Sequence, residues 1–282
     1  MRRYTLIVIP ILVFFWWLVM AHGERANAKE GDSIGQVPIL LYHRFGPPVD
    51  SMTVTPTVFE SDLKYLNEHG YTVIPLKELV YYLLKEGPPP KNRSVIITAD
   101  DGHRSVYSTM FPILKRYRVP VTLFLYPSAI SNASYAMTWE ELREMKEAGL
   151  FDFQSHTYWH PNFRKEKKRL EPEEYEKFVE MQLKKSREKI EKELNVRVTM
   201  LAWPFGIYDD ELMKKALEAG YVAAFTMERH HASLSDNTMA LPRYLMVNTD
   251  HPAINLERIL VRGSARGAHK DPADSRSVQE VR

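Results

Sequence analysis

The stretch Ser94-Val95-Ile96-Ile97-Thr98-Ala99-Asp100-Asp101-Gly102 carries an apolar run directly into two adjacent carboxylates and a glycine. A short apolar run of this kind predicts a buried strand. In parallel α/β architectures, sites are built at the carboxyl ends of such strands. Gly102 lets the backbone bend sharply, so both carboxylates can reach one pocket. The N-cap of a following helix would explain an Asp-Gly pair without any chemistry.

Apolar strands and amphipathic helices alternate on both sides of this stretch. Strands are predicted at 38–42, 94–98, 119–126, 151–155, 198–203, 221–225 and 241–247. Helices are predicted at 58–68 after an N-cap at Thr57, at 76–85, 103–117, 164–193 and 209–219, and from a capping box at Thr138 to Gly149. Such alternation predicts an α/β domain with a mostly parallel sheet.

Composition restricts the function classes that are open to the chain. Its 282 residues contain 38 Lys+Arg against 36 Asp+Glu, so no basic surplus is present to bind nucleic acid. The absence of cysteine excludes disulfides, thiolate zinc sites and a thiol nucleophile. Any metal ion must therefore be held by histidine and carboxylate side chains.

The two ends of the chain differ from its middle. Residues 1–28 combine a basic start, an apolar run at 6–21 and the small-x-small triplet Ala26-Asn27-Ala28, which predicts a signal peptide or a membrane anchor. In both cases the remainder lies outside the cytoplasm; a buried N-terminal helix is the other interpretation. Residues 29–36 are predicted to be a linker, 37–262 a single catalytic domain and 263–282 a disordered tail.

A second motif follows the predicted strand at 151–155. In Ser155-His156-Thr157-Tyr158-Trp159-His160, two histidines stand four residues apart, and on a helical turn this spacing places both rings on one face. Two histidines and one aspartate can hold a divalent ion and leave a position open for water. The other aspartate of the first stretch is then available as a base.

The motifs resemble those of the polysaccharide deacetylase family, which is carbohydrate esterase family 4 with the NodB homology domain. Residues 98–102 resemble its first motif, residues 155–160 its second, and Ala202-Trp203-Pro204-Phe205-Gly206 its third, which usually reads Arg-x-Pro-Tyr-Gly. The resemblance spans roughly residues 37–250. It implies a distorted (β/α)7 barrel and a metal-dependent N-deacetylase.

The resemblance also implies roles for individual residues. Asp100 corresponds to the catalytic base, and Asp101, His156 and His160 correspond to the ligands of one divalent metal ion, zinc or alternatively cobalt or nickel. The backbone N–H of Phe205 corresponds to the oxyanion donor, although a core aromatic beside a Pro-Gly turn is an alternative interpretation.

Two departures from the family pattern stand out. Ala202 replaces the arginine that usually contacts the base; Arg243 is the candidate substitute, or else a surface cation. The late Leu-x-His motif that supplies the general acid is not visible. His43, in a Tyr-His-Arg sequence similar to the branch that de-N-acetylates poly-β-1,6-N-acetylglucosamine, is the expected acid, with the pair His230 and His231 as its rival.

We therefore expect an exported, monomeric N-deacetylase whose partner is an acetylated amino-sugar polysaccharide and not nucleic acid, with membrane association possible through its N-terminus. Poly-β-1,6-N-acetyl-D-glucosamine is the leading substrate, and chitin oligomers or peptidoglycan are the alternatives. A non-catalytic carbohydrate-binding protein and a metallo-phosphoesterase are two further hypotheses. The second would normally need more carboxylates and a bridging ligand.

Overall fold

The computed structural model of the protein describes residues 35–47 and 50–262. The predictions of a signal peptide or anchor at 1–28 and of a disordered tail at 263–282 lie outside these residues. Within the described ranges, no helix combines the length and the apolar character needed to cross a membrane. The described residues all belong to one compact unit.

The central element is a parallel sheet. Among the described residues its strands are β1 (Ile39–Tyr42), β4 (Thr72–Val73), β5 (Ser94–Asp101), β6 (Val121–Leu125), β7 (Phe151–Ser155), β8 (Met200–Ala202), β9 (Ala223–Phe225) and β10 (Tyr244–Leu245). The strand order is β10-β1-β5-β6-β7-β8-β9, with β4 paired to β5, and the paired strands are parallel. A smaller sheet pairs β2 (Arg44–Phe45) with β3 (Thr53–Val54).

The sheet closes on itself next to its last strand. Leu241 forms a parallel bridge with Phe225 of β9, in which Leu241 N donates to Ala224 O and Thr226 N donates to Leu241 O, both at 2.8 Å. Three residues later, Tyr244 of β10 pairs with Leu40 of β1. The segment 241–245 therefore joins the two edges of the sheet, and the predicted distorted (β/α)7 barrel is confirmed.

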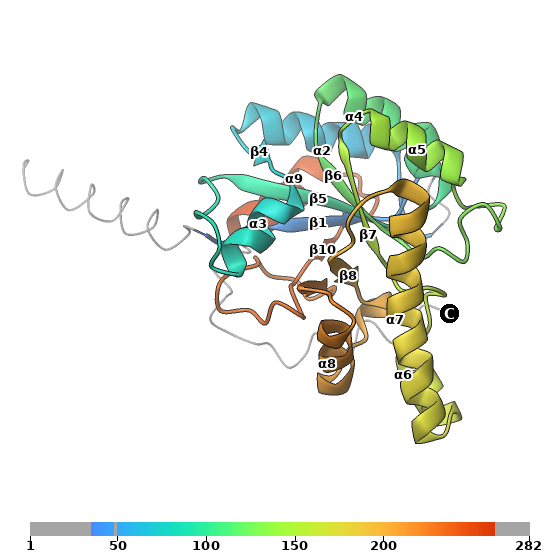
Figure 1. The fold of residues 1–282 in the computed structure, drawn as a ribbon. Coiled ribbons are helices and arrows are strands. Elements are labelled where there is room, and N and C mark those ends of the chain that lie inside the picture. The colour runs from blue at the N-terminus through green and yellow to red at the C-terminus, as the bar shows by residue number, and fades with distance from the viewer. Residues whose placement is uncertain (1–34, 48–49, 263–282) are drawn as a thin grey trace, which may run out of the picture. The chain divides into compact units, whose positions relative to one another are not determined.

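Helices follow most strands and cover the outside of the barrel (Figure 1). They are α2 (Pro56–Glu68), α3 (Leu76–Leu83), α4 (Phe111–Tyr117), α5 (Trp139–Glu147), α6 (Phe163–Arg169), α7 (Pro172–Leu194), α8 (Asp210–Glu218) and α9 (Pro252–Glu257). Shorter helical turns lie at Val106–Met110, Pro204–Gly206 and Arg258–Arg262. Helix α7 contacts α5, α6 and α8, so this long helix packs against several of its neighbours.

Alternation along the strands divides the apolar side chains into two clusters. Val95 and Ile97 of β5 face the helices, whereas Ile96 packs with Phe124 and Phe225 in a second cluster. Leucines of α3, including Leu79, belong to that second cluster. Because successive strand side chains point to opposite faces, one strand supplies both clusters.

Three predicted elements differ in detail from the structure. Thr55, not Thr57, caps α2, because its side chain accepts a hydrogen bond from Val58 N and Pro56 occupies the first helical position. The single helix predicted at 164–193 is two helices, since Pro172 begins α7 after a break. The strand predicted at 241–247 keeps strand pairing only at β10 and at the Leu241 bridge.

A buried carboxylate lies beneath the end of β1. Asp62 of α2 is 2% exposed and accepts a hydrogen bond of 2.8 Å from the Tyr42 hydroxyl. Burial raises the pKa of Asp62 to about 7, against the opposing effect of that hydrogen bond. The folded protein therefore keeps a proton on Asp62 at pH values where the unfolded chain has released it.

This difference predicts a pH-dependent stability. The contribution of Asp62 is fully present below its unfolded pKa and is lost as the pH rises through its folded pKa. Between about pH 4 and pH 8, the free energy of unfolding of the parent should fall by up to about 4 kcal/mol relative to Asp62→Asn. Urea denaturation of both proteins across this range checks the prediction. The same change of the free energy of unfolding with pH in both proteins would contradict it.

Candidate active site

The two adjacent aspartates end β5, at the carboxyl edge of the sheet. Asp100 continues the inward alternation of Ile96 and Thr98 and is 2% exposed. Strand alternation alone would turn Asp101 away from that side. Its backbone instead has a φ of 75°, a left-handed conformation that non-glycine residues rarely adopt. This strained conformation interrupts the alternation of side chains along β5. The carboxylates of Asp100 and Asp101 can therefore both approach His156.

The two motif histidines lie in the loop that follows β7. The expected helical turn between them is wrong, because residues 156–160 form an irregular loop with positive φ values of 63° at Thr157 and 58° at His160. The loop nevertheless brings the rings together, with centroids 4.5 Å apart. Their convergence therefore depends on loop backbone geometry and not on helical periodicity.

One carboxylate oxygen lies near both imidazoles. Asp101 Oδ1 is 3.6 Å from His156 Nε2 and 3.7 Å from His160 Nε2. One ligand atom from each of the three residues lies within 4.8 Å of the others, a spacing that allows them to share one ion. The predicted set Asp101, His156 and His160 is thus brought together in space.

The electrostatics of the histidines fit a metal site. Burial lowers the pKa of His156 to about 3 and that of His160 to about 4, so both rings are neutral near pH 7. The Ala202 carbonyl oxygen lies 2.8 Å from His156 Nδ1, which places the ring proton there and leaves the Nε2 lone pair toward Asp101. Two neutral imidazoles and a carboxylate are a donor set that suits a divalent ion such as zinc.

Arg243 contacts Asp100, which is the role of the family arginine that Ala202 replaces in this sequence. Its Nη1 donates to Asp100 Oδ1 at 2.8 Å and its Nη2 to Asp100 Oδ2 at 2.7 Å. The side chain is 0% exposed, so its interpretation as a surface cation is wrong. Its Nε donates to Thr226 O, and the guanidinium lies over the ring of Phe124.

This pairing sets the charge of Asp100. Burial acts to raise the pKa of Asp100, but Arg243 and His156 outweigh it and lower that pKa to about 2. Each carboxylate oxygen of Asp100 accepts one hydrogen bond from the Arg243 guanidinium and retains a further lone pair. Asp100 is therefore an ionised carboxylate with acceptor capacity left, and its Oδ2 is 3.7 Å from His156 Nε2.

His43 follows β1 and is 4% exposed. Its Nδ1 is a buried atom with no hydrogen-bond partner among the described residues. Burial lowers the pKa of His43, while the carboxylates of Asp101 and Asp100 act in the opposite direction. An unpaired imidazole nitrogen within the field of both site carboxylates is thus available for a ligand.

The rival histidines are held by other groups. His230 Nε2 lies 2.9 Å from Asp236 Oδ1, and His231 Nε2 lies 2.9 Å from Ile259 O. The next residue, Ala232, bridges Val37, before the start of β1, whereas His43 follows the end of that strand. The geometry therefore favours His43 over this pair.

Phe205 lies beside the histidine cluster. Its backbone has a φ of 58°, and its ring centroid is 4.6 Å from that of His160. The side chain is 48% exposed, which contradicts the alternative of a core aromatic. A left-handed backbone at a bulky residue is uncommon and is often found where backbone groups are aimed at a ligand.

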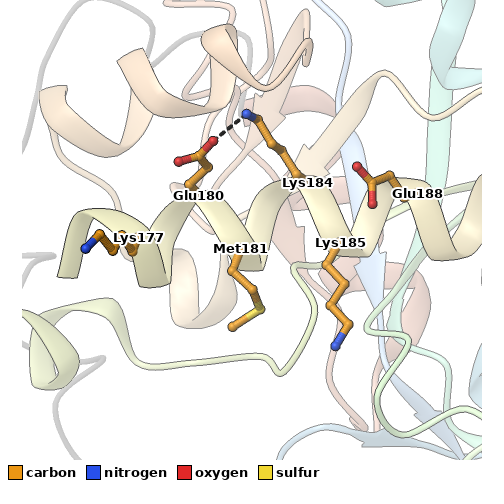
Figure 2. Close-up of a pocket in the computed structure, with 6 residues that line it drawn as sticks. All are labelled: Lys177, Glu180, Met181, Lys184, Lys185 and Glu188. Carbon is orange, nitrogen blue, oxygen red and sulfur yellow. Dashed lines mark hydrogen bonds and ion pairs between the residues drawn. The ribbon is translucent and has the colours of Figure 1, made fainter. Parts of the chain in front are cut away.

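A separate shallow hollow of about 460 Å³ lies along α7 and is lined by charged side chains and one methionine (Figure 2). Its lining residues are Lys177, Glu180, Met181, Lys184, Lys185 and Glu188. None of them belongs to the Asp-His cluster, so we do not connect this hollow with the chemistry.

Comparison with known proteins agrees with this geometry. The family model described as polysaccharide deacetylase matches residues 87–224. The poly-β-1,6-N-acetyl-D-glucosamine N-deacetylase of Staphylococcus aureus is 30% identical over 274 residues, covering 87% of this chain and 92% of that protein. The chain belongs to the polysaccharide deacetylase family. As a member of it, the protein is an enzyme, a polysaccharide N-deacetylase.

Other members show the same sequence relation and the same fold. The enzyme of the same name from Staphylococcus epidermidis is 30% identical over 204 residues, covering 71% of this chain and 70% of that protein. Streptococcus pyogenes deacetylase PplD, solved with acetate, superposes with a TM-score of 0.70 at 24% identity, covering 80% of this chain and 98% of that one. IcaB from Ammonifex degensii superposes with a TM-score of 0.68 at 23% identity, covering 80% of this chain and 97% of that one. These solved deacetylases show that the barrel is shared.

Some residues around the site were not predicted. Gln182 of α7 is 0% exposed and contacts the histidine loop, and Tyr126 has its ring centroid 5.3 Å from that of His160. The only signal for Gln182 was a polar residue on the apolar face of a long helix. Tyr126 ended a predicted strand, a position shared by many aromatic residues that have no functional role.

Proposed function

We propose that this polysaccharide deacetylase is metal-dependent and removes N-acetyl groups from poly-β-1,6-N-acetyl-D-glucosamine outside the cell. The observation that carries the proposal is the convergence of Asp101, His156 and His160, with an ionised Asp100 beside them. The 30% identity to the staphylococcal enzymes supports this choice of substrate. The export signal predicted at 1–28 supports the location.

A divalent ion held by Asp101, His156 and His160, zinc or alternatively cobalt or nickel, would polarise the acetamide carbonyl and acidify the attacking water. Asp100 accepts the proton that this water loses, because its bonds to Arg243 keep it ionised. The backbone N–H of Phe205 stabilises the developing oxyanion.

His43 completes the reaction in this proposal. The carbon–nitrogen bond breaks when the leaving nitrogen takes a proton, and His43 is the imidazole available to donate it. The products are acetate and a free amine on the sugar. The nearly balanced charge of the chain suits a polymer that begins uncharged. We expect the enzyme to act as a monomer, with its N-terminal segment as a possible attachment to the membrane.

Acetate release from linkage-defined oligomers tests the proposal. The enzyme should deacetylate β-1,6-linked N-acetylglucosamine oligomers faster than β-1,4-linked chitin oligomers or peptidoglycan fragments. Treatment with a chelator should stop the release, and added zinc, cobalt or nickel should restore it. Release that survives chelation would contradict the metal-dependent mechanism. A preference for β-1,4 oligomers would contradict the substrate.

Replacement of His43 tests the assignment of the acid. His43→Gln should slow acetamide hydrolysis by about 10²-fold, a typical loss for a general acid. An aryl acetate ester, whose leaving group needs no proton, should be hydrolysed almost as fast as by the parent. His231→Gln is the matched control and should leave both rates unchanged. If His231→Gln slowed acetamide hydrolysis and His43→Gln did not, His231 would be the general acid instead.

A further inference from the structure

Helix α7 carries two buried polar side chains on its apolar face. Gln182 and Ser186 are both 0% exposed, and their neighbours on this face, Val179, Leu183 and Ile190, are buried apolar residues. Buried polar groups are retained where they have partners. The partners of Gln182 and Ser186 lie in the segment from Ser155 to Trp159, between the end of β7 and His160.

Gln182 binds the turn between the two histidines directly. Its Oε1 accepts hydrogen bonds from two consecutive backbone amides, Tyr158 N at 3.1 Å and Trp159 N at 2.8 Å. The preceding amide, Thr157 N, donates to Ser155 Oγ at 3.2 Å, and this oxygen also contacts Ser186 Oγ at 2.8 Å. Three successive amides of the turn are therefore held by side chains.

The turn needs such support because its backbone is strained. Thr157 and His160 adopt left-handed conformations, which persist only where the surroundings impose them. Outer contacts add to this support. The ring centroid of Trp159 is 5.9 Å from that of Phe178, and Lys185 Nζ lies 4.3 Å from the centroid of Tyr158. Figure 2 shows Lys185 leaving α7 on the same side as Met181, away from Glu180 and Lys184.

We propose that Gln182 is a positioning residue for the metal centre. By holding the 157–160 turn, it keeps His160 Nε2 beside Asp101 Oδ1, to which that nitrogen lies at 3.7 Å. This inference rests on the proposed function, since it assumes that these groups bind a divalent ion. Loss of such an outer partner typically lowers metal affinity by about 10–100-fold.

The test compares variants of Gln182 with the parent by two measurements. These are the zinc affinity, from competition with a chromophoric chelator, and the visible spectrum of the cobalt-loaded protein. Gln182→Met keeps the length but removes the acceptor, and it should weaken zinc binding by about 10–100-fold and alter the cobalt spectrum. Gln182→Glu keeps the acceptor oxygen and should stay within a few-fold of the parent. Gln182→Asn, whose amide is one methylene shorter, should weaken binding even where the Met variant does not fold.

Ile190→Ala is the matched structural control. Ile190 is also buried on α7, eight residues and about 12 Å along the helix axis from Gln182. This variant should lower thermal stability while zinc affinity and the cobalt spectrum stay those of the parent. If Gln182→Met and Gln182→Asn bind zinc like the parent, the positioning role is overturned. If the parent itself binds no zinc or cobalt, the proposed function fails instead.

Discussion

Asp100→Asn should lower the rate of acetate release by about 10³-fold while the fold and the metal site persist. The amide matches the carboxylate in shape and can still accept a bond from Arg243, but it cannot take a proton from the attacking water. The proposed ligands Asp101, His156 and His160 are unchanged in this variant. Steady-state kinetics on acetylated oligomers, with zinc content measured on the same samples, checks the prediction.

A second carboxylate provides the control for this variant. Asp152 lies near the start of β7, at the opposite end of the strand from His156, and its carboxylate accepts hydrogen bonds from the Gln154 amide. Asp152→Asn should leave kcat within a few-fold of the parent. Activity within tenfold of the parent in the Asp100→Asn variant, with zinc bound, would show that another group is the base. Loss of zinc from that variant would instead place Asp100 among the ligands.

Arg243→Gln should destabilise the protein by about 3–5 kcal/mol, because it leaves a buried ionised carboxylate without its partner. The side chains of Arg243 and Asp100 are 0% and 2% exposed, so water cannot replace the lost bonds. Equilibrium unfolding in urea measures the change in the free energy of unfolding. Arg243→Lys keeps the charge without the two-pronged fork and should recover only part of the loss.

A double-mutant cycle separates the ion pair from general packing. When Asp100→Asn is combined with Arg243→Gln, the buried charge is absent, and the double variant should be more stable than Arg243→Gln alone. A coupling energy below about 0.5 kcal/mol between the two substitutions would contradict the pairing. The same result would remove the largest of the contributions that lower the pKa of Asp100.

Local sequence signals were sufficient for a mostly parallel α/β sheet and for a site of histidines and aspartates, whereas the closed barrel and the choice of Asp101 as the ligand were implied by the family resemblance. The main strands of the barrel were marked by short apolar runs, although the two-residue strands β2, β3 and β4 were not predicted, and parallel strands place their carboxyl ends at one edge of a sheet. Residues at the ends of β5 and β7, such as Asp101 and His156, were therefore expected to meet even though they lie 55 positions apart in the sequence. Metal-binding residue types at those ends defined the candidate site.

Features that depend on distant contacts or on unusual backbone geometry were beyond the sequence. Asp and His adopt left-handed conformations more often than most non-glycine residues, but still only in a minority of cases, so residue type alone could not locate those of Asp101 and His160. Arg243 could be named only as a candidate, because its pairing with Asp100 spans 143 positions and depends on barrel closure. Gln182 was overlooked because a single polar residue on a helix face is usually solvated.

Closure of the barrel at Leu241 has a consequence for Asp100. Arg243 belongs to the segment that joins the two edges of the barrel, so Asp100 has this counter-ion only where the barrel is closed. A chain terminated by translation or proteolysis before residue 243 would contain the three proposed metal ligands and still lack this arginine. The ionised state of Asp100 therefore depends on synthesis of the chain at least through residue 243.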